Sequence, residues 1–106
     1  MRTRVKFGDL KIQKLNRVAL PSALLENLSL NVGSEVSVFL DSIKNEIVIG
    51  KSRGKRVKFG DLKIQKLNRV ALPSALLENL SLNVGSEVHI FLDIEKDEIV
   101  LGGDYA

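Results

Sequence analysis

The stretch from Arg4 to Val36 has the sequence RVKFGDLKIQKLNRVALPSALLENLSLNVGSEV, and it recurs without a change at residues 56–88. The repeat continues to Gly50 and Gly102 at a constant offset of 52 residues. A unit of about 47 residues cannot easily bury its own apolar face, whereas two copies can cover each other as an isologous dimer does. The repeat therefore predicts a homodimer fused head to tail, with pseudo-twofold symmetry.

All differences between the two copies follow the identical stretch. They are Ser37/His89, Val38/Ile90, Ser42/Ile94, Ile43/Glu95, Asn45/Asp97 and Ile49/Leu101. Such near-identity indicates either a recent duplication or a deliberate joining of two copies of one subunit.

The first half of each copy has the pattern of two strands. Residues 5–16 alternate apolar and polar side chains, and Gly8 interrupts the alternation where we expect a β-bulge. Leu15-Asn16 is a candidate tight turn because asparagine tolerates positive φ. Residues 17–20 then form the second strand, with Val18 and Leu20 expected to face the core.

The second half of each copy predicts a helix and two more strands. Pro21 stops the second strand and favours a helix start, so a short leucine-rich helix is expected over residues 22–28. Residues 35–41 alternate in polarity as a strand does, and residues 46–49 form the last strand after a hairpin loop. Each copy is therefore a ββαββ unit.

The fold class is mainly β with short helices. We assign the first copy to residues 4–50, a basic linker to 51–56 and the second copy to 57–102. Six linker residues span at most about 20 Å, so the end of one copy lies near the start of the next. This favours two ββαββ units intertwined as one pseudo-twofold barrel over two separate domains.

Composition removes several classes of function. The chain of 106 residues has no cysteine and one histidine, which excludes disulfides, thiolate zinc sites and a repeated histidine-based active site. It has no Gly-rich phosphate loop and no repeated Ser/His/Asp arrangement, so we expect no enzyme, no cofactor, no metal and no small-molecule substrate. Neither a membrane span nor a secretory signal is visible, which predicts a cytoplasmic protein. A net charge of +3 permits a nucleic-acid partner.

Two sequence motifs in each copy resemble those of a known protein family. Residues 15–21, LNRVALP, precede the leucine-rich helix, and residues 30–36, LNVGSEV, follow it. The pattern resembles the AbrB/MazE/SpoVT-type swapped-hairpin proteins over nearly all of each copy. The resemblance implies an intertwined dimeric β-barrel in a DNA-binding transcription regulator, and MraZ-like members carry two copies in one chain. The related double-psi β-barrel remains an alternative topology.

Basic residues of the first two strands are the candidate site. No acidic residue lies between Leu10 and Val18, or between their equivalents in the second copy, so the two copies are expected to form two basic arms. Arginine grips phosphate or guanine edges with two hydrogen bonds, and lysine supplies a point charge. The candidate residues for binding duplex DNA are Arg4, Lys6, Lys11, Lys14, Arg17, Arg56, Lys58, Lys63, Lys66 and Arg69.

Other polar and aromatic residues have simpler interpretations. His89 is expected at the surface, and the four phenylalanines in the core. The acidic residues of the last hairpins are expected to form a solvated rim; they are Asp41, Glu46, Asp93, Glu95, Asp97 and Glu98.

Two other functions remain open at this point. A fused homodimer serving as a folding or evolution scaffold, with no retained activity, would explain the perfect identity over 33 residues. It would also explain why Leu25-Glu26 stands where the family often carries basic residues. A protein-interaction module using exposed strand edges is the third hypothesis. In each case the chain is expected to be a monomeric pseudo-dimer.

Overall fold

A computed structural model describes residues 4–50 and 56–102, so the expected linker lies outside the described residues except for Arg56. In each copy a strand, one turn of 3-10 helix, a short strand, a short α-helix and two further strands follow one another, which confirms the predicted order. The elements of the first copy are β1 (Arg4–Lys11), η1 (Lys14–Asn16), β2 (Arg17–Ala19), α1 (Ser22–Asn27), β3 (Glu35–Asp41) and β4 (Glu46–Gly50). Those of the second copy are β5 (Val57–Lys63), η2 (Lys66–Asn68), β6 (Arg69–Ala71), α2 (Ser74–Asn79), β7 (Glu87–Asp93) and β8 (Glu98–Gly102).

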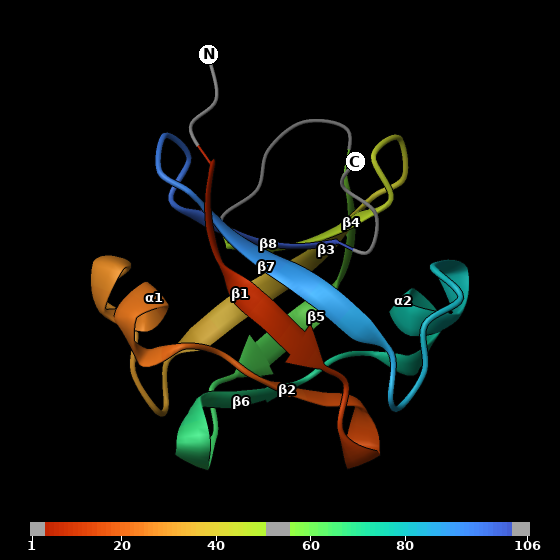
Figure 1. Ribbon diagram of the computed structural model, residues 1–106, viewed down its shortest axis with the longest axis horizontal. Coiled ribbons are helices and arrows are strands. Elements are labelled where there is room, and N and C mark those ends of the chain that lie inside the picture. Colours follow the sequence, from red (N-terminus) through yellow and green to blue (C-terminus); the bar gives the residue numbers. More distant parts are fainter. Residues whose placement is uncertain (1–3, 51–55, 103–106) are drawn as a thin grey trace.

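Six strands, three from each copy, form one antiparallel sheet in which strands of the two copies pair with each other. Their order is β1-β7-β8-β4-β3-β5. The first strand of each copy therefore pairs with the third strand of the other copy, and β4 pairs with β8 in the middle (Figure 1). As a result, each copy completes its sheet only with strands from the other.

The remaining strands, β2 and β6, form a separate two-stranded sheet. Figure 1 shows this ribbon below the ends of β1 and β5, which are the two edges of the main sheet. A single closed barrel is thus not confirmed, because the main sheet is open. The chain leaves the main sheet at a reversal in which Leu15 and Asn16 both have positive φ, and this reversal directs β2 towards β6.

Most local predictions are confirmed. The register of β1 against β7 shifts between Lys6 and Gly8, where the bulge was expected. Asn16 has φ 59° in the predicted turn, and β3 has the predicted bounds. Helix α1 begins directly after Pro21 and ends at Asn27, one residue before the predicted end.

The core lies between the main sheet, the ribbon and the two helices. Val18 and Leu24 are completely buried, as are their equivalents in the second copy. Leu20 and Leu25 are 3% exposed, and Leu28 packs at the edge of the cluster. The apolar face predicted for the short helix is therefore the face that holds it in place, since two turns of helix are unstable alone.

The phenylalanines correct one expectation. Phe7 and Phe59 are half-buried and pack against the core, but Phe39 and Phe91 lie outside the core cluster. Side chains alternate along a strand, and the valines and leucines of β3 and β7 occupy the core-facing positions. Phe39 and Phe91 thus lie on the opposite face of the sheet.

Candidate nucleic-acid interface

The β2-β6 ribbon brings the two copies' second strands together. Val18 and Val70 lie opposite each other at its centre and are fully buried. Because side chains alternate, Arg17 and Arg69 point to the face turned away from the core, each opposite an alanine. Diagonal positions of this kind are about 7–8 Å apart. The sequence suggested two basic arms, whereas the strand pairing places both arginines on one short ribbon.

A turn of 3-10 helix precedes each strand of the ribbon. Turns η1 and η2 lie at the two lower corners in Figure 1. Leu15 and Leu67 have φ 64° within them, a left-handed conformation that costs a non-glycine residue about 1–2 kcal/mol. Their side chains are 72% and 74% exposed, so packing does not offset this cost. Each turn presents a leucine and a lysine to solvent beside the ribbon.

Each turn is attached to the other copy. The side-chain amide of Asn16 donates a hydrogen bond to Ser74 Oγ at 3.1 Å, and Asn68 donates to Ser22 Oγ at the same distance. The backbone N–H of Leu72 also donates to the carbonyl of Asn16 at 2.8 Å. These bonds hold the turns against the helix starts, so the spacing of the basic side chains is set by both copies together.

Two further pairs of basic residues lie near the ribbon. Lys14 and Lys66 are exposed in the turns, and Lys11 and Lys63 are exposed at the ends of β1 and β5. Glu87 is the register partner of Lys11, and the second copy repeats this arrangement. A carboxylate opposite a lysine reduces its net positive potential, so the ribbon and its turns hold the least compensated charge.

The guanidinium of Arg69 is only partly satisfied. Its Nε atom is buried without a hydrogen-bond partner among the residues that the structure describes. A buried donor in this state costs free energy in the folded protein.

Arg4 and Arg56 lie away from the ribbon and bind carboxylates within the chain. Arg4 Nη1 lies 2.7 Å from Glu46 Oε2, and Arg56 Nη1 lies 2.9 Å from Glu98 Oε2. Arg56 Nε is also 3.7 Å from Asp41 Oδ2. These two arginines, which the sequence analysis grouped with the other basic candidates, have their charge compensated by glutamates of β4 and β8.

The same pairs correct the expectation of a solvated acidic rim. Glu46 and Glu98 are 2% exposed, and Asp93 is 6% exposed. The sequence places Glu46 and Glu98 next to a hairpin loop, but each pairs with an arginine 42 residues away in the chain. Glu95 and Asp97 remain exposed, as predicted.

Lys6 and Lys58 occupy the edge strands and also form ion pairs. Lys6 Nζ lies 3.2 Å from Asp9 Oδ1, and Lys58 Nζ lies 3.0 Å from Asp61 Oδ1. All four side chains are about half exposed, so these pairs are weak and can exchange for another anion.

The two aspartates of these pairs have different third partners. The pKa of Asp9 is lowered from 3.8, first by its hydrogen bond with His89 and then by Lys6. The pKa of Asp61 is lowered from 3.8, first by the hydroxyl of Ser37, which donates at 2.7 Å, and then by Lys58. Each interaction favours the folded state above pH 3.8 and is lost as the pH falls through the folded-state pKa.

Replacing His89 with alanine is expected to raise the pKa of Asp9 towards 3.8 and to leave that of Asp61 unchanged. The imidazole is the largest cause of the lowered value at Asp9, and it does not contact Asp61. Carbon-detected NMR titration of the aspartate carboxylates measures both values in one sample. Ser37→Ala is the matched change and should move only Asp61. Equal movement of both aspartates would contradict the assignment.

Two other findings concern the described part of the chain. None of its helices has the length and apolar character needed to cross a membrane. Within residues 4–50 and 56–102, no three histidine or carboxylate side chains come together as a metal site would require.

Comparison with known proteins finds a likeness in fold alone. No family model matches the chain, and no curated protein matches it. Among solved structures, it is similar to PHS018 from Pyrococcus horikoshii, known from a solution structure. The two share 19% sequence identity with a TM-score of 0.55, over 99% of this chain and 96% of that chain. At this identity the likeness extends to the fold alone.

Proposed function

We propose that this protein binds duplex DNA through the outer face of the β2-β6 ribbon and its two flanking turns. The observation that carries the proposal is the placement of Arg17 and Arg69, both half-buried, on the outer face of one ribbon, flanked by the exposed Lys14 and Lys66. The segments that carry these four cations, residues 11–17 and 63–69, contain no acidic residue.

A two-stranded antiparallel ribbon is an element that can bind a duplex. The major groove of B-DNA admits a two-stranded antiparallel β-ribbon, and several DNA-binding proteins use one. Arg17 and Arg69 are related by the pseudo-twofold axis of the repeat, so they would meet two half-sites related in the same way. Lys14 and Lys66 would lie over the flanking phosphates, where they position the ribbon without selecting a sequence.

The strand exchange supports a swapped-hairpin architecture for this function. In that arrangement the first strands of two copies cross over and pair with the partner copy, as β1 and β5 do. We therefore propose that the chain is a single-chain member of the swapped-hairpin class of DNA-binding regulators. A double-psi barrel is the alternative topology for the same repeated unit.

Binding to a random-sequence 25-base-pair duplex is expected to be strongly salt-dependent. Four cations on the ribbon and turns, with Lys11 and Lys63, give about six phosphate contacts, which implies roughly a thousandfold loss of affinity between 50 and 200 mM salt. Fluorescence anisotropy of a labelled duplex measures this slope. Affinity that does not change with salt, or no binding at 50 mM salt, would overturn the proposal. The second of these is also the result expected of a folding scaffold without activity.

A further inference from the structure

A cavity opens between the copies, away from the ribbon. It has a volume of about 530 Å³ and lies between the end of α1, strand β3, the end of β4 and the loop that joins β7 to β8. The first three come from the first copy and the loop from the second. The lining residues are Asn27, Leu28, Ser29, Leu30, Glu35, Val36, Ser37, Ile49, Gly50, Lys96 and Asp97.

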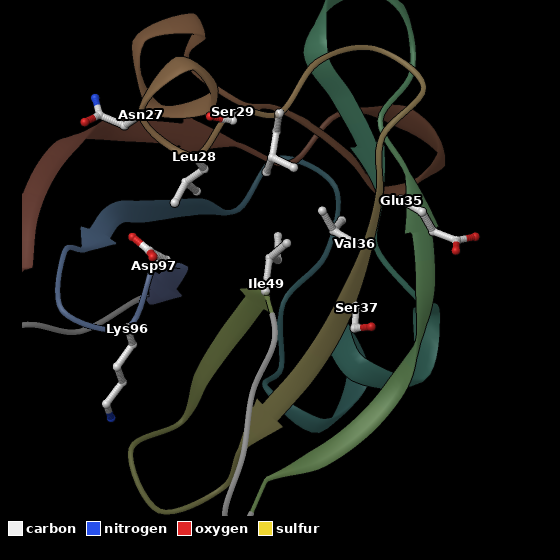
Figure 2. A pocket seen from close by; sticks show the side chains of 11 residues that line it. Asn27, Leu28, Ser29, Glu35, Val36, Ser37, Ile49, Lys96 and Asp97 are labelled. Atoms are coloured by element: carbon white, nitrogen blue, oxygen red, sulfur yellow. The ribbon is translucent and has the colours of Figure 1, made fainter.

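The cavity has the size and lining of a small-molecule site. Ligand pockets typically measure about 300–1,000 Å³ and combine apolar walls with a few polar groups. In Figure 2 the side chains of Leu28, Val36 and Ile49 converge on one space, and the carboxylate of Asp97 lies at its edge. The ends of Glu35 and Lys96 point away from that space (Figure 2). Asp97 is therefore the charged group closest to the apolar walls.

The two copies differ at this place. Asp97 corresponds to Asn45 of the first copy, and Ser37 and Ile49 correspond to His89 and Leu101 of the second. The cavity thus has a carboxylate where the equivalent position in the other half of the molecule has a neutral amide. Differences between otherwise identical copies fall on residues that line this cavity, which gives the two halves different electrostatic preferences.

We propose that this cavity binds a small amphipathic cation, namely a primary amine on an aryl or alkyl group. The hydrocarbon would displace water from Leu28, Val36 and Ile49. The ammonium would donate a charge-assisted hydrogen bond to Asp97 at the rim. The amide of Asn45 offers no charge to such an ion, so the equivalent position binds it less well. This site is separate from the β2-β6 ribbon and does not depend on DNA binding.

The test compares three compounds that share a 2-phenylethyl group and differ in charge. 2-Phenylethylammonium, 2-phenylethanol and 3-phenylpropionate are titrated into the full chain, and binding is followed by backbone amide NMR. The amine is expected to shift the amides of Leu28, Val36, Ile49 and Asp97, and to bind about tenfold more tightly than the alcohol. The carboxylate should bind more weakly than either.

Two variants identify the cause of that preference. Asp97→Asn introduces the residue of the first copy, and it should make the amine bind no more tightly than the alcohol. Glu95→Gln removes the same charge from an exposed residue of the same loop and should leave the preference unchanged.

Two results would overturn the inference. One is the absence of shifts around the cavity with any of the three compounds at 10 mM. The other is an unchanged preference for the amine in Asp97→Asn. Because no variant touches the ribbon, failure here leaves the DNA-binding proposal intact.

Discussion

Replacing Arg56 with alanine is expected to lower the free energy of unfolding by about 3–5 kcal/mol. Arg56 Nη1 donates to both carboxylate oxygens of Glu98, at 3.0 and 2.9 Å. The Glu98 side chain is 3% exposed, so it cannot regain water when the guanidinium is removed. A buried carboxylate without its counter-charge keeps its desolvation cost and loses the attraction that offset it. Urea denaturation followed by circular dichroism at pH 7 measures the change.

A matched control, Lys58, lies two residues further along the chain, in β5. Lys58→Ala removes a cation whose partner, Asp61, is 48% exposed, so the expected loss of stability is much smaller than for Arg56→Ala. The double variant Arg56→Met with Glu98→Leu should recover much of the stability, since an apolar pair needs no counter-charge. Similar losses in Arg56→Ala and Lys58→Ala would show that burial of the pair is not what matters.

Reversing the charge of Arg17 and Arg69 together is expected to abolish detectable duplex binding at 50 mM salt. Each Arg→Glu substitution replaces a cation of the proposed interface with an anion, which the DNA phosphates would repel, and the two positions lie on one ribbon face. Anisotropy with the same 25-base-pair duplex measures binding, and a thermal melt checks that the variant is folded. If the half-buried ribbon does not tolerate glutamate, Lys14→Glu with Lys66→Glu changes the exposed turns instead and should weaken binding strongly.

The control for net charge uses the opposite end of the molecule. Lys44 and Lys96 are exposed in the two loops at the top of Figure 1, and Lys44→Glu with Lys96→Glu lowers the net charge by the same amount. This variant should keep most of its affinity, because contacts with phosphate are local while the long-range attraction is screened beyond about 10 Å at 0.1 M salt. Equal loss in both variants would contradict an interface on the ribbon.

Local elements could be predicted because their causes lie within a few residues. Alternation over residues 35–41 predicted β3, Pro21 marked the start of α1, and Gly8 marked the bulge. Each depends on backbone conformation or on the period of apolar side chains, which the neighbouring sequence determines. The same reasoning predicted that Val18 and Leu20 are buried, which is confirmed.

The errors concern partners distant in the chain. Glu46 and Glu98 were expected to face solvent because they border an acidic hairpin loop. Each is instead buried against an arginine 42 residues away in the chain. Phe39 and Phe91 were expected in the core because they are large and apolar. Their position in the alternation assigns them to the opposite face of the sheet, and the core was already filled by aliphatic residues.

The candidate DNA-binding site could also be predicted only in part. The absence of acidic residues around Arg17 and Arg69 is visible in the sequence, and it singled out these segments. That the two arginines share one ribbon follows only from the pairing of Val18 with Val70, which joins positions 52 residues apart. The cavity beside Asp97 could not be predicted, since its walls come from both copies.

By itself, the sequence determined the repeated ββαββ unit, its turns and its buried aliphatic positions, because short-range sterics and side-chain periodicity specify them. Tertiary structure alone decided which strand of one copy pairs with which strand of the other, and therefore which charges are buried and which face solvent. Those outcomes depend on the free energy of forming the whole sheet from strands of both copies. Burial of a charge such as Glu98 is tolerated only where a distant strand supplies its counter-ion.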